Sequence, residues 1–180
     1  MSKNKNWKLL KRKKVYGSKF VNVYEDKIEL TNGSIIDDYT VIEKPSVVIV
    51  VATDKNNHII VLREYKYAAG ETLLSLPAGH KKKDEQPIDA ARRELLEETG
   101  FGGNDFEELG MLYDYPTKDL HKVYVIRAKN VVKKGDVEHE ETEMISYQSL
   151  TVDELKNQIK NKEWKGSSAL ASITFSGILF

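Results

Sequence analysis

The first part of the chain alternates apolar and polar residues, which is the pattern of a half-buried β-strand. Residues 18–31 show this alternation clearly and predict a strand. Asn32-Gly33 is a strong signal for a two-residue hairpin turn, so residues 34–43 are predicted to form the returning strand. A hairpin region with so few apolar residues cannot bury much surface alone. We therefore expect it to pack on the rest of the chain or on a second copy of it.

The pattern changes after Pro45. Residues 46–53 are a continuous β-branched run, which is typical of a strand buried on both faces. Residues 54–57 form a turn signal, and residues 58–67 predict the partner strand. Residues 68–72 are expected to be a loop, and residues 73–79 lead the chain into an acidic helix.

The second half of the chain predicts three more strands and two helices. The strands are expected over residues 106–116, 121–131 and 144–150, with a polar, acidic loop at 133–143. Thr151 followed by Glu154 is a capping box and predicts a helix to about Lys160. Residues 166–180 predict a final helix. Strands and helices do not alternate strictly, so the fold class is α+β.

The acidic helix carries the clearest chemical signal. Pro87 fits its first position and Gly100 fits the left-handed position just after its last turn. Ile88, Ala91 and Leu95 recur at helical spacing and predict a buried stripe, whereas Glu94, Glu97 and Glu98 are expected on a different face. Like charges at this spacing repel each other by a few tenths of a kcal/mol per pair. A hard divalent cation such as Mg²⁺ or Mn²⁺, which binds oxygen ligands, would reverse that cost.

Composition excludes several kinds of chemistry. Lys+Arg and Asp+Glu number 28 each, so net charge gives no argument for a nucleic-acid or membrane partner. There is no cysteine, which rules out disulfides, cysteine nucleophiles and thiolate metal sites. No apolar run approaches the length of a membrane span, and the basic N-terminus lacks an apolar signal core. These features lead us to expect a cytoplasmic protein.

Two polar features keep alternative interpretations open. Residues 1–15 are basic with apolar residues between the lysines, which suits a nucleic-acid arm but better suits a frayed terminus that runs into a lysine-guarded edge strand. The four histidines have no metal-ligand spacing, and we expect them at the surface. They are His58, His80, His121 and His139.

The stretch around the acidic helix resembles the signature of Nudix hydrolases at each fixed position. The pattern is Gly, five residues, Glu, seven residues, Arg-Glu, an aliphatic residue, any residue, Glu-Glu, any residue, Gly and an apolar residue. The matching residues are Gly79, Glu85, Arg93, Glu94, Leu95, Glu97, Glu98, Gly100 and Phe101. This resemblance implies a mixed β-sheet between helices, formed by a catalytic domain over residues 45–180 and preceded by an N-terminal β region over residues 1–44.

The order of segments is similar to that of the ADP-ribose pyrophosphatase branch of this family. Pro116 lies fifteen positions after Phe101, at the distance that marks ADP-sugar hydrolases. The resemblance places Arg63 and Lys66 among the substrate contacts, although relatives often carry arginine where Lys66 stands. Asp119 is the candidate for a glutamate that many relatives have after this proline. Lysine lacks the bidentate fork of arginine, so a phosphate or base contact at Lys66 would differ from that in relatives. The departures at Lys66 and Asp119 put ADP-ribose as the substrate in question more than the type of reaction.

The resemblance also implies roles in the reaction. Glu94, Glu97, Glu98 and the backbone carbonyl of Ala78 would bind Mg²⁺, for which Mn²⁺ is a substitute. Glu85, Arg93, Gly79 and Gly100 would shape the site, with Arg93 holding a glutamate such as Glu97. A late acidic loop would supply the general base. Alignment on the following strand favours Glu141 over Glu143, with a solvated acidic loop as the alternative.

In this family, which the sequence resembles, the N-terminal region packs across a homodimer and contributes to the base-binding cleft of the other subunit. Phe20 and Tyr24 would then stack on adenine, or would instead be core residues. Three functions remain. The first is Mg²⁺-dependent hydrolysis of ADP-ribose. The second is hydrolysis of another substrate, such as GDP-mannose, another nucleotide sugar, a dinucleoside polyphosphate or an oxidised nucleotide. The third is a non-catalytic binder of nucleotides or nucleic acids, against which the intact set of acids argues.

Overall fold

The computed structural model describes residues 6–137 and 145–180. These residues form two compact units. The first comprises Met1–Pro45 and Tyr113–Lys122, and the second comprises Ser46–Leu112 and Val123–Phe180. The division expected from the sequence, at residue 44, remains a prediction for the functional domains.

A three-stranded antiparallel sheet forms the first unit, in the order β1-β2-β3. Its strands are β1 (Lys8–Gly17), β2 (Asn22–Glu29) and β3 (Ile35–Glu43). The predicted hairpin turn is confirmed, because Gly33 has φ 86° and its N–H donates to the carbonyl of Leu30 at 3.0 Å. Glycine adopts this left-handed conformation without a steric penalty.

The segment Tyr113–Lys122 attaches to the edge of this sheet at β3. Ile42 N donates to Lys118 O at 2.7 Å, and Leu120 N donates to Ile42 O at 2.8 Å. The two bonds form a short parallel bridge. The strand predicted over residues 106–116 therefore ends early. β9 spans Asp105–Tyr113, because Lys118 N and Asp119 N both turn back to the carbonyl of Tyr115.

The second unit is built on a mixed sheet with the order β11-β5-β4-β10-β8. β4 (Val47–Asp54) runs parallel to β10 (Lys122–Lys133). β5 (Ile59–Lys66) pairs with β4 only where Thr53 meets Ile59. Farther along, β7 (Ala78–His80) takes that place on β4, with Ala78 opposite Ile49. This pairing holds the approach to the acidic helix against the most buried strand.

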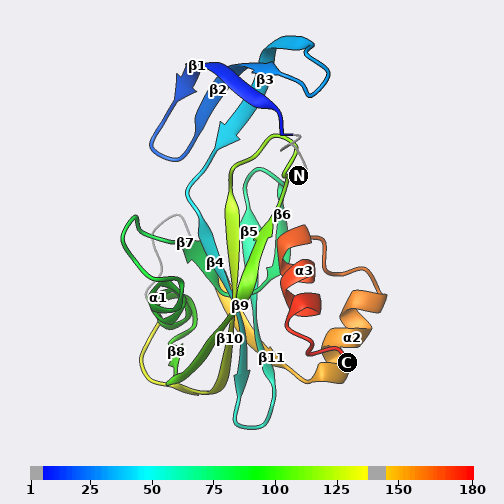
Figure 1. Ribbon diagram of the computed structural model, residues 1–180. Helices are drawn as coiled ribbons and strands as arrows, with labels where there is room; N and C mark the ends of the chain where they lie inside the picture. Colours follow the sequence, from blue (N-terminus) through cyan, green and yellow to red (C-terminus); the bar gives the residue numbers. More distant parts are fainter. Residues whose placement is uncertain (1–5, 138–144) are drawn as a thin grey trace, which may run out of the picture. The chain divides into compact units, whose positions relative to one another are not determined.

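Helices cover both faces of this sheet (Figure 1). On one face α1 (Pro87–Thr99) packs through Ala91 and Leu95 against β4 side chains such as Val50. On the other face α2 (Val152–Lys160) and α3 (Ser167–Phe175) pack through Leu155 and Ile173 against the alternate β4 residues Ile49 and Val51. Side chains of a strand alternate between faces, so a run that is apolar at every position must be covered twice. The predicted mixed sheet between helices is confirmed.

Several boundaries differ from the predictions. β6 (Glu71–Ser75) begins inside the expected loop at 68–72, because Glu71 pairs with Lys66 across a tight turn. β8 (Phe101–Gly102) was not predicted, and β11 spans Ile145–Leu150. The last helix ends at Phe175 instead of continuing to residue 180, since Gly177 turns left-handed with φ 74°. No helix in residues 6–137 and 145–180 is long and apolar enough to cross a membrane.

Candidate active site

α1 begins and ends where the sequence predicts. Pro87 occupies the start of the helix, where a missing N–H is tolerated. Gly100 follows the last turn with φ 67° and donates its N–H to Leu96 O at 2.7 Å. A side chain at this position would also collide with Gly135, whose carbonyl oxygen lies 2.3 Å from an ideal Cβ. The helix is therefore fixed in register with its neighbours at its C-terminal end.

Arg93 is the centre of the carboxylate cluster. Its Nε and Nη2 donate to the two oxygens of Glu85 at 3.0 and 3.1 Å. Its Nη1 donates to Glu94 Oε1 at 2.6 Å and to Glu97 Oε2 at 3.0 Å. Nη2 also reaches the carbonyl of His80 at 3.0 Å, which links α1 to β7. The bond to Glu97 is the one that the sequence predicts, and the other contacts are additional.

The pKa values of two acids around Arg93 are shifted in opposite directions. The guanidinium lowers the pKa of Glu85, whose carboxylate also accepts from Lys82 N at 2.9 Å. Burial raises the pKa of Glu94, and this effect outweighs the attraction of Arg93. The Glu85 hydrogen bonds in turn raise the pKa of Arg93. Glu85 thus uses both oxygens within the protein, whereas the Arg93 bonds use one oxygen each of Glu94 and Glu97.

β7 faces the same acids. Glu98 Oε2 accepts from Ala78 N at 2.9 Å, and the Glu98 residue is only 6% exposed. An ideal Cβ on Gly79 would lie 2.1 Å from the carboxyl carbon of Glu94, so only glycine leaves room for that carboxylate. The expectation that all three glutamates lie away from the buried side of the helix is wrong for Glu98. Its carboxylate turns towards β7 and is covered by it.

The donor set suits a hard cation. Ala78, Glu94, Glu97 and Glu98 come from the facing elements α1 and β7, and they offer only oxygen ligands, as Mg²⁺ and Mn²⁺ prefer. In the described residues, no three acidic or histidine side chains are already arranged around one ion position. Arg93 instead gathers the carboxylates. A partly buried carboxylate such as Glu94 would be stabilised in its charged form by a metal ion.

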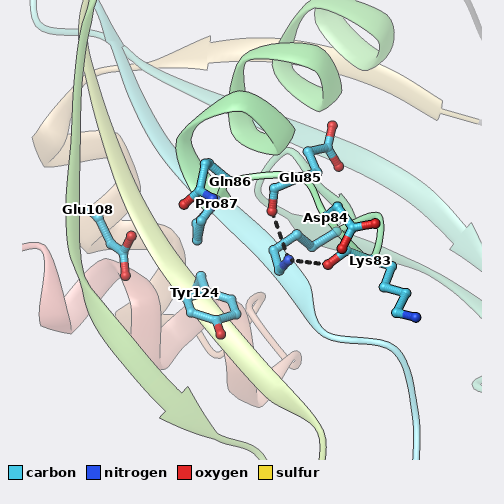
Figure 2. A pocket seen from close by; sticks show the side chains of 8 residues that line it. Lys83, Asp84, Glu85, Gln86, Pro87, Glu108 and Tyr124 are labelled. Atoms are coloured by element: carbon cyan, nitrogen blue, oxygen red, sulfur yellow. Dashed lines mark hydrogen bonds between the residues drawn. The ribbon is translucent and has the colours of Figure 1, made fainter.

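A separate pocket of about 510 Å³ lies at the start of α1. Figure 2 shows Glu108 and Tyr124, from β9 and β10, opposite the loop that carries Lys83 and Glu85. Glu85 is the only Nudix-signature acid among the described residues that line it. The pocket mixes opposite charges and does not include the glutamates of the candidate metal site, so we do not assign it to the reaction.

The candidate substrate contacts in the second unit lie on β5. Arg63 is exposed, opposite Leu74 on β6 and Ser146 on β11. Lys66 is also exposed and forms an ion pair with Glu64 on the same strand. This pairing reduces the local positive charge that Lys66 would offer to a phosphate.

The aromatic candidates in the first unit have different surroundings. Phe20 is 49% exposed, with Lys19 Nζ 4.8 Å from its ring centre. Tyr24 donates its hydroxyl to Glu43 Oε2 at 2.6 Å, and the Arg12 guanidinium lies 4.8 Å from its ring centre. The Glu43 bond also raises the pKa of Tyr24. Tyr24 is therefore held within its sheet, whereas Phe20 projects from the β1–β2 turn.

Asp119 lies inside the first unit. Its side chain is 4% exposed, forms an ion pair with Lys44 and accepts from His121 N at 2.9 Å. This burial favours an internal role over the substrate contact expected from the sequence. The expected surface position of the histidines is also wrong for His121, which is 8% exposed and whose Nδ1 lies 2.7 Å from the carbonyl oxygen of Pro45. Lys44 and His121 were not among the predicted site residues, and no local pattern marks contacts across such a separation.

Three basic residues of β1 are paired with acids of the neighbouring strand β2. On β1, Arg12 forms two hydrogen bonds with Asp26 of β2, at 2.8 and 2.6 Å. Lys8 and Lys13 pair with other β2 acids, Glu29 and Glu25. These cross-strand pairs support the edge-strand interpretation over the nucleic-acid arm.

The candidate bases Glu141 and Glu143, together with His139, lie outside the described residues.

Comparison with known proteins agrees with this architecture. The NUDIX domain family matches residues 43–171, and the family described as nucleoside diphosphate sugar hydrolase N-terminal domain matches residues 7–42. A methanol dehydrogenase activator from Bacillus methanolicus is 27% identical over 93% of this chain and 91% of its own. An ADP-ribose pyrophosphatase from Bacillus subtilis strain 168 is 25% identical over 87% of this chain and 84% of its own.

Among solved structures, that of an ADP compounds hydrolase superposes with a TM-score of 0.84, at 23% identity over 98% of this chain and 95% of the other. At this identity the likeness concerns the fold. The family match covers most of the chain and includes the whole Arg93 cluster. The chain therefore belongs to the Nudix hydrolase family.

Proposed function

We propose that the protein hydrolyses the pyrophosphate bond of a nucleoside diphosphate sugar with the help of Mg²⁺, and that the substrate is ADP-ribose, which gives AMP and ribose 5-phosphate. The observation that carries the proposal is the convergence of Glu85, Glu94 and Glu97 on Arg93. The match of residues 7–42 to a nucleoside diphosphate sugar hydrolase N-terminal domain supports the substrate class. So does the similarity to an ADP-ribose pyrophosphatase.

The proposed ligands of Mg²⁺ are Glu94, Glu97, Glu98 and the carbonyl of Ala78, and Mn²⁺ would substitute. When bound, the metal neutralises the charge of the pyrophosphate, polarises its phosphorus and acidifies a water molecule. The protein keeps the ligands in place. Arg93 orients Glu94 and Glu97 through hydrogen bonds, and the Ala78 N–H orients Glu98. Holding ligands through such outer contacts is what tunes a metal site.

The general base is proposed to be Glu141, with Glu143 as the alternative. A base has to lie within hydrogen-bond reach of the attacking water, so replacing it with glutamine should remove most of the rate. We expect Glu141→Gln to lose more activity than Glu143→Gln in steady-state assays with Mg²⁺. The reverse order would assign the base to Glu143.

Recognition of the substrate is proposed to use residues of one chain for the phosphates and the N-terminal region of a second copy for the base. Arg63 and Lys66 would contact the phosphates, and Phe20 would stack on adenine through its exposed ring, with Tyr24 as the less accessible aromatic. We also propose that the first unit pairs with a second copy of the chain. Stacking of a base on an aromatic side chain is worth about 1–3 kcal/mol per base, so Phe20→Ala should raise KM more than it lowers kcat.

A panel of substrates tests the function. Purified protein is incubated with ADP-ribose, GDP-mannose, NADH, diadenosine polyphosphates or 8-oxo-dGTP, each with Mg²⁺ and with EDTA. We expect ADP-ribose to have the highest kcat/KM and EDTA to abolish turnover. A different best substrate would replace ADP-ribose as the proposal. Failure to hydrolyse any of them with Mg²⁺ would favour a non-catalytic binder.

A further inference from the structure

The first unit contains a buried carboxylate that the proposed reaction does not use. The Asp119 side chain is 4% exposed and is paired with Lys44, whose own side chain is 37% exposed. Asp119 also accepts from the backbone N–H of His121 at 2.9 Å. A buried charge is stable only when it is paired and hydrogen-bonded. The Lys44–Asp119 pair is therefore a defined contact inside the first unit.

The backbone on either side of Asp119 is bound to β3. Ile42 donates to Lys118 O at 2.7 Å and accepts from Leu120 N at 2.8 Å. Tyr39, also on β3, donates its hydroxyl to Thr117 O and lies under the ammonium of Lys118, 3.6 Å from its ring centre. The segment after Pro116 is thus bound to the sheet at several successive residues.

His121 adds a second connection beyond the bridge. Its Nδ1 lies 2.7 Å from the carbonyl oxygen of Pro45. A carbonyl oxygen only accepts, so Nδ1 must carry the proton, which leaves Nε2 facing Asp114 Oδ2 at 3.7 Å. Lys44 and Pro45 directly follow β3, and Asp119 and His121 lie in the segment. The consecutive residues Lys44 and Pro45 therefore bind Asp119 and His121, which lie about 75 positions later in the chain.

We infer that Asp119 is a positioning residue, which fastens the segment Tyr113–Lys122 to β3 through Lys44 and so makes the N-terminal sheet and the segment after Pro116 one recognition element. The recognition part rests on the proposed function. The fastening itself does not. Loss of the anchor should free the segment and weaken substrate binding, while the carboxylate cluster of α1 stays intact.

The two partners of the ion pair are not equivalent. Lys44→Met leaves the Asp119 charge buried without its partner, which is a strongly destabilising situation. Asp119→Asn leaves only a partly exposed lysine, and the asparagine oxygen can still accept from His121 N. Lys44→Met should therefore be the more damaging variant. Lys44→Arg keeps the positive charge and should retain most of the attachment. Asp37→Asn is a matched control, because it breaks the exposed Lys27–Asp37 pair of the same sheet.

Amide hydrogen exchange of the full-length protein measures how firmly the segment Tyr113–Lys122 is held on β3, independently of activity. We expect the amides of Ile42 and Leu120 to exchange about tenfold faster in Lys44→Met, by a smaller factor in Asp119→Asn, and at the wild-type rate in Asp37→Asn. In kinetics with the best substrate of the panel, Lys44→Met and Asp119→Asn should raise KM severalfold with kcat nearly unchanged. If nothing in the panel is hydrolysed, the proposed function fails, and calorimetric affinity for ADP-ribose replaces KM.

The inference is overturned if exchange at Ile42 and Leu120 is unchanged in Lys44→Met and Asp119→Asn. It is also overturned if exchange accelerates while KM, or the affinity, stays at the wild-type value, because the contact would then be structural only. A fall in kcat equal to the change in kcat/KM would contradict it as well, since it would place the effect in the chemical step.

Discussion

Arg93 resolves the electrostatic conflict on α1. Three glutamates within one and a half turns should repel each other, and each like-charged pair weakens a helix by a few tenths of a kcal/mol. The guanidinium donates to Glu94 and Glu97 on the helix and to Glu85 before it. The positive guanidinium offsets the repulsion between Glu94 and Glu97, whereas Glu98 accepts from Ala78 N. One carboxylate oxygen each of Glu94 and Glu97 takes no part in the Arg93 bonds, and such an oxygen is the atom that would bind a metal ion.

Gly79 gives a prediction that separates activity from stability. In Gly79→Ala the new Cβ would lie about 2 Å from the Glu94 carboxylate, so that carboxylate must move away. Since the end of a glutamate side chain moves easily, unfolding should change little. Hydrolysis should fall by roughly 100-fold, as expected when several kcal/mol of metal-based stabilisation is disturbed. The measurements are kcat/KM with Mg²⁺ and the midpoint of thermal unfolding.

Gly135→Ala is the control for this variant, because an added Cβ meets no atom within 4 Å there. It should keep wild-type activity. Full activity in Gly79→Ala would show that Glu94 does not need its observed position. A large loss of stability in Gly79→Ala would show that β7 cannot adapt, and the activity result would then say nothing about Glu94.

At the scale of elements, α2 illustrates how completely local chemistry defines a helix start. Thr151 accepts from Glu154 N at 3.2 Å, while Glu154 Oε2 accepts from Thr151 N at 2.8 Å, which is the predicted capping box. Thr151→Ala removes the acceptor and should destabilise the protein by about 1 kcal/mol. Urea unfolding measures this change. Thr40→Ala, at an exposed position of β3, is a control that should change stability much less.

The same box predicts a dependence on pH. The Thr151 backbone hydrogen bond lowers the pKa of Glu154 below its ordinary value of 4.5. A folded-state pKa that is depressed stabilises the fold above the unfolded pKa, and this contribution is lost as pH falls through the folded pKa. The difference in unfolding midpoint between wild type and Glu154→Gln should therefore be largest near neutral pH and shrink below about pH 4.5. A difference that grows in acid would contradict the lowered pKa.

Features set by neighbouring residues were predictable from the sequence. These include the Asn32-Gly33 turn, the limits of α1 and the cap of α2, because each depends on residues within one or two turns. Contacts between distant segments were not predictable. Replacement of β5 by β7 beside β4 depends on tertiary pairing, and so does the burial of Glu98 against Ala78. The resemblance to Nudix hydrolases identified the acids and the Arg93–Glu97 contact, but it did not indicate that Arg93 also binds Glu85 and Glu94.

Burial of Asp119 shows the same limit. Its partners Lys44 and His121 carry no signal in the sequence, since a lysine and a histidine near polar residues are ordinary surface residues. Only the bridge between β3 and the segment after Pro116 brings them together. The sequence predicts a substrate contact in this segment, which stays a prediction, whereas the attachment of the segment to β3 is seen only in the fold.

At the scale of the whole molecule, the first unit exposes much apolar surface. All residues of β1 are exposed, and the strand pairs only with β2 among the described residues. Its large apolar side chains, with Trp7 just before it, are 41–58% exposed: Trp7, Leu9, Leu10, Val15 and Tyr16. β1 also carries five basic residues, but an edge strand with exposed apolar side chains and an unpaired backbone edge can still pair with another chain. This surface supports the proposed pairing with a second copy.

Sedimentation tests that pairing. We expect wild type to sediment at twice the mass of one chain, and Leu10→Lys with Val15→Lys to shift it towards the monomer by placing charges in the buried surface. Phe180→Lys is the control, because Phe180 is 95% exposed and lies outside this sheet. A monomeric wild type, or a double variant that remains fully dimeric, would contradict dimerisation through β1.

The most direct test of the account is the rate of AMP release from ADP-ribose by Glu98→Gln in the presence of Mg²⁺. The amide oxygen of glutamine can still accept from Ala78 N, so the variant should unfold at nearly the same temperature as wild type. Loss of the anionic oxygen should lower kcat/KM by about 100-fold or more. Wild-type turnover in a folded Glu98→Gln protein would contradict the assignment of this carboxylate to the metal, and with it the proposed mechanism.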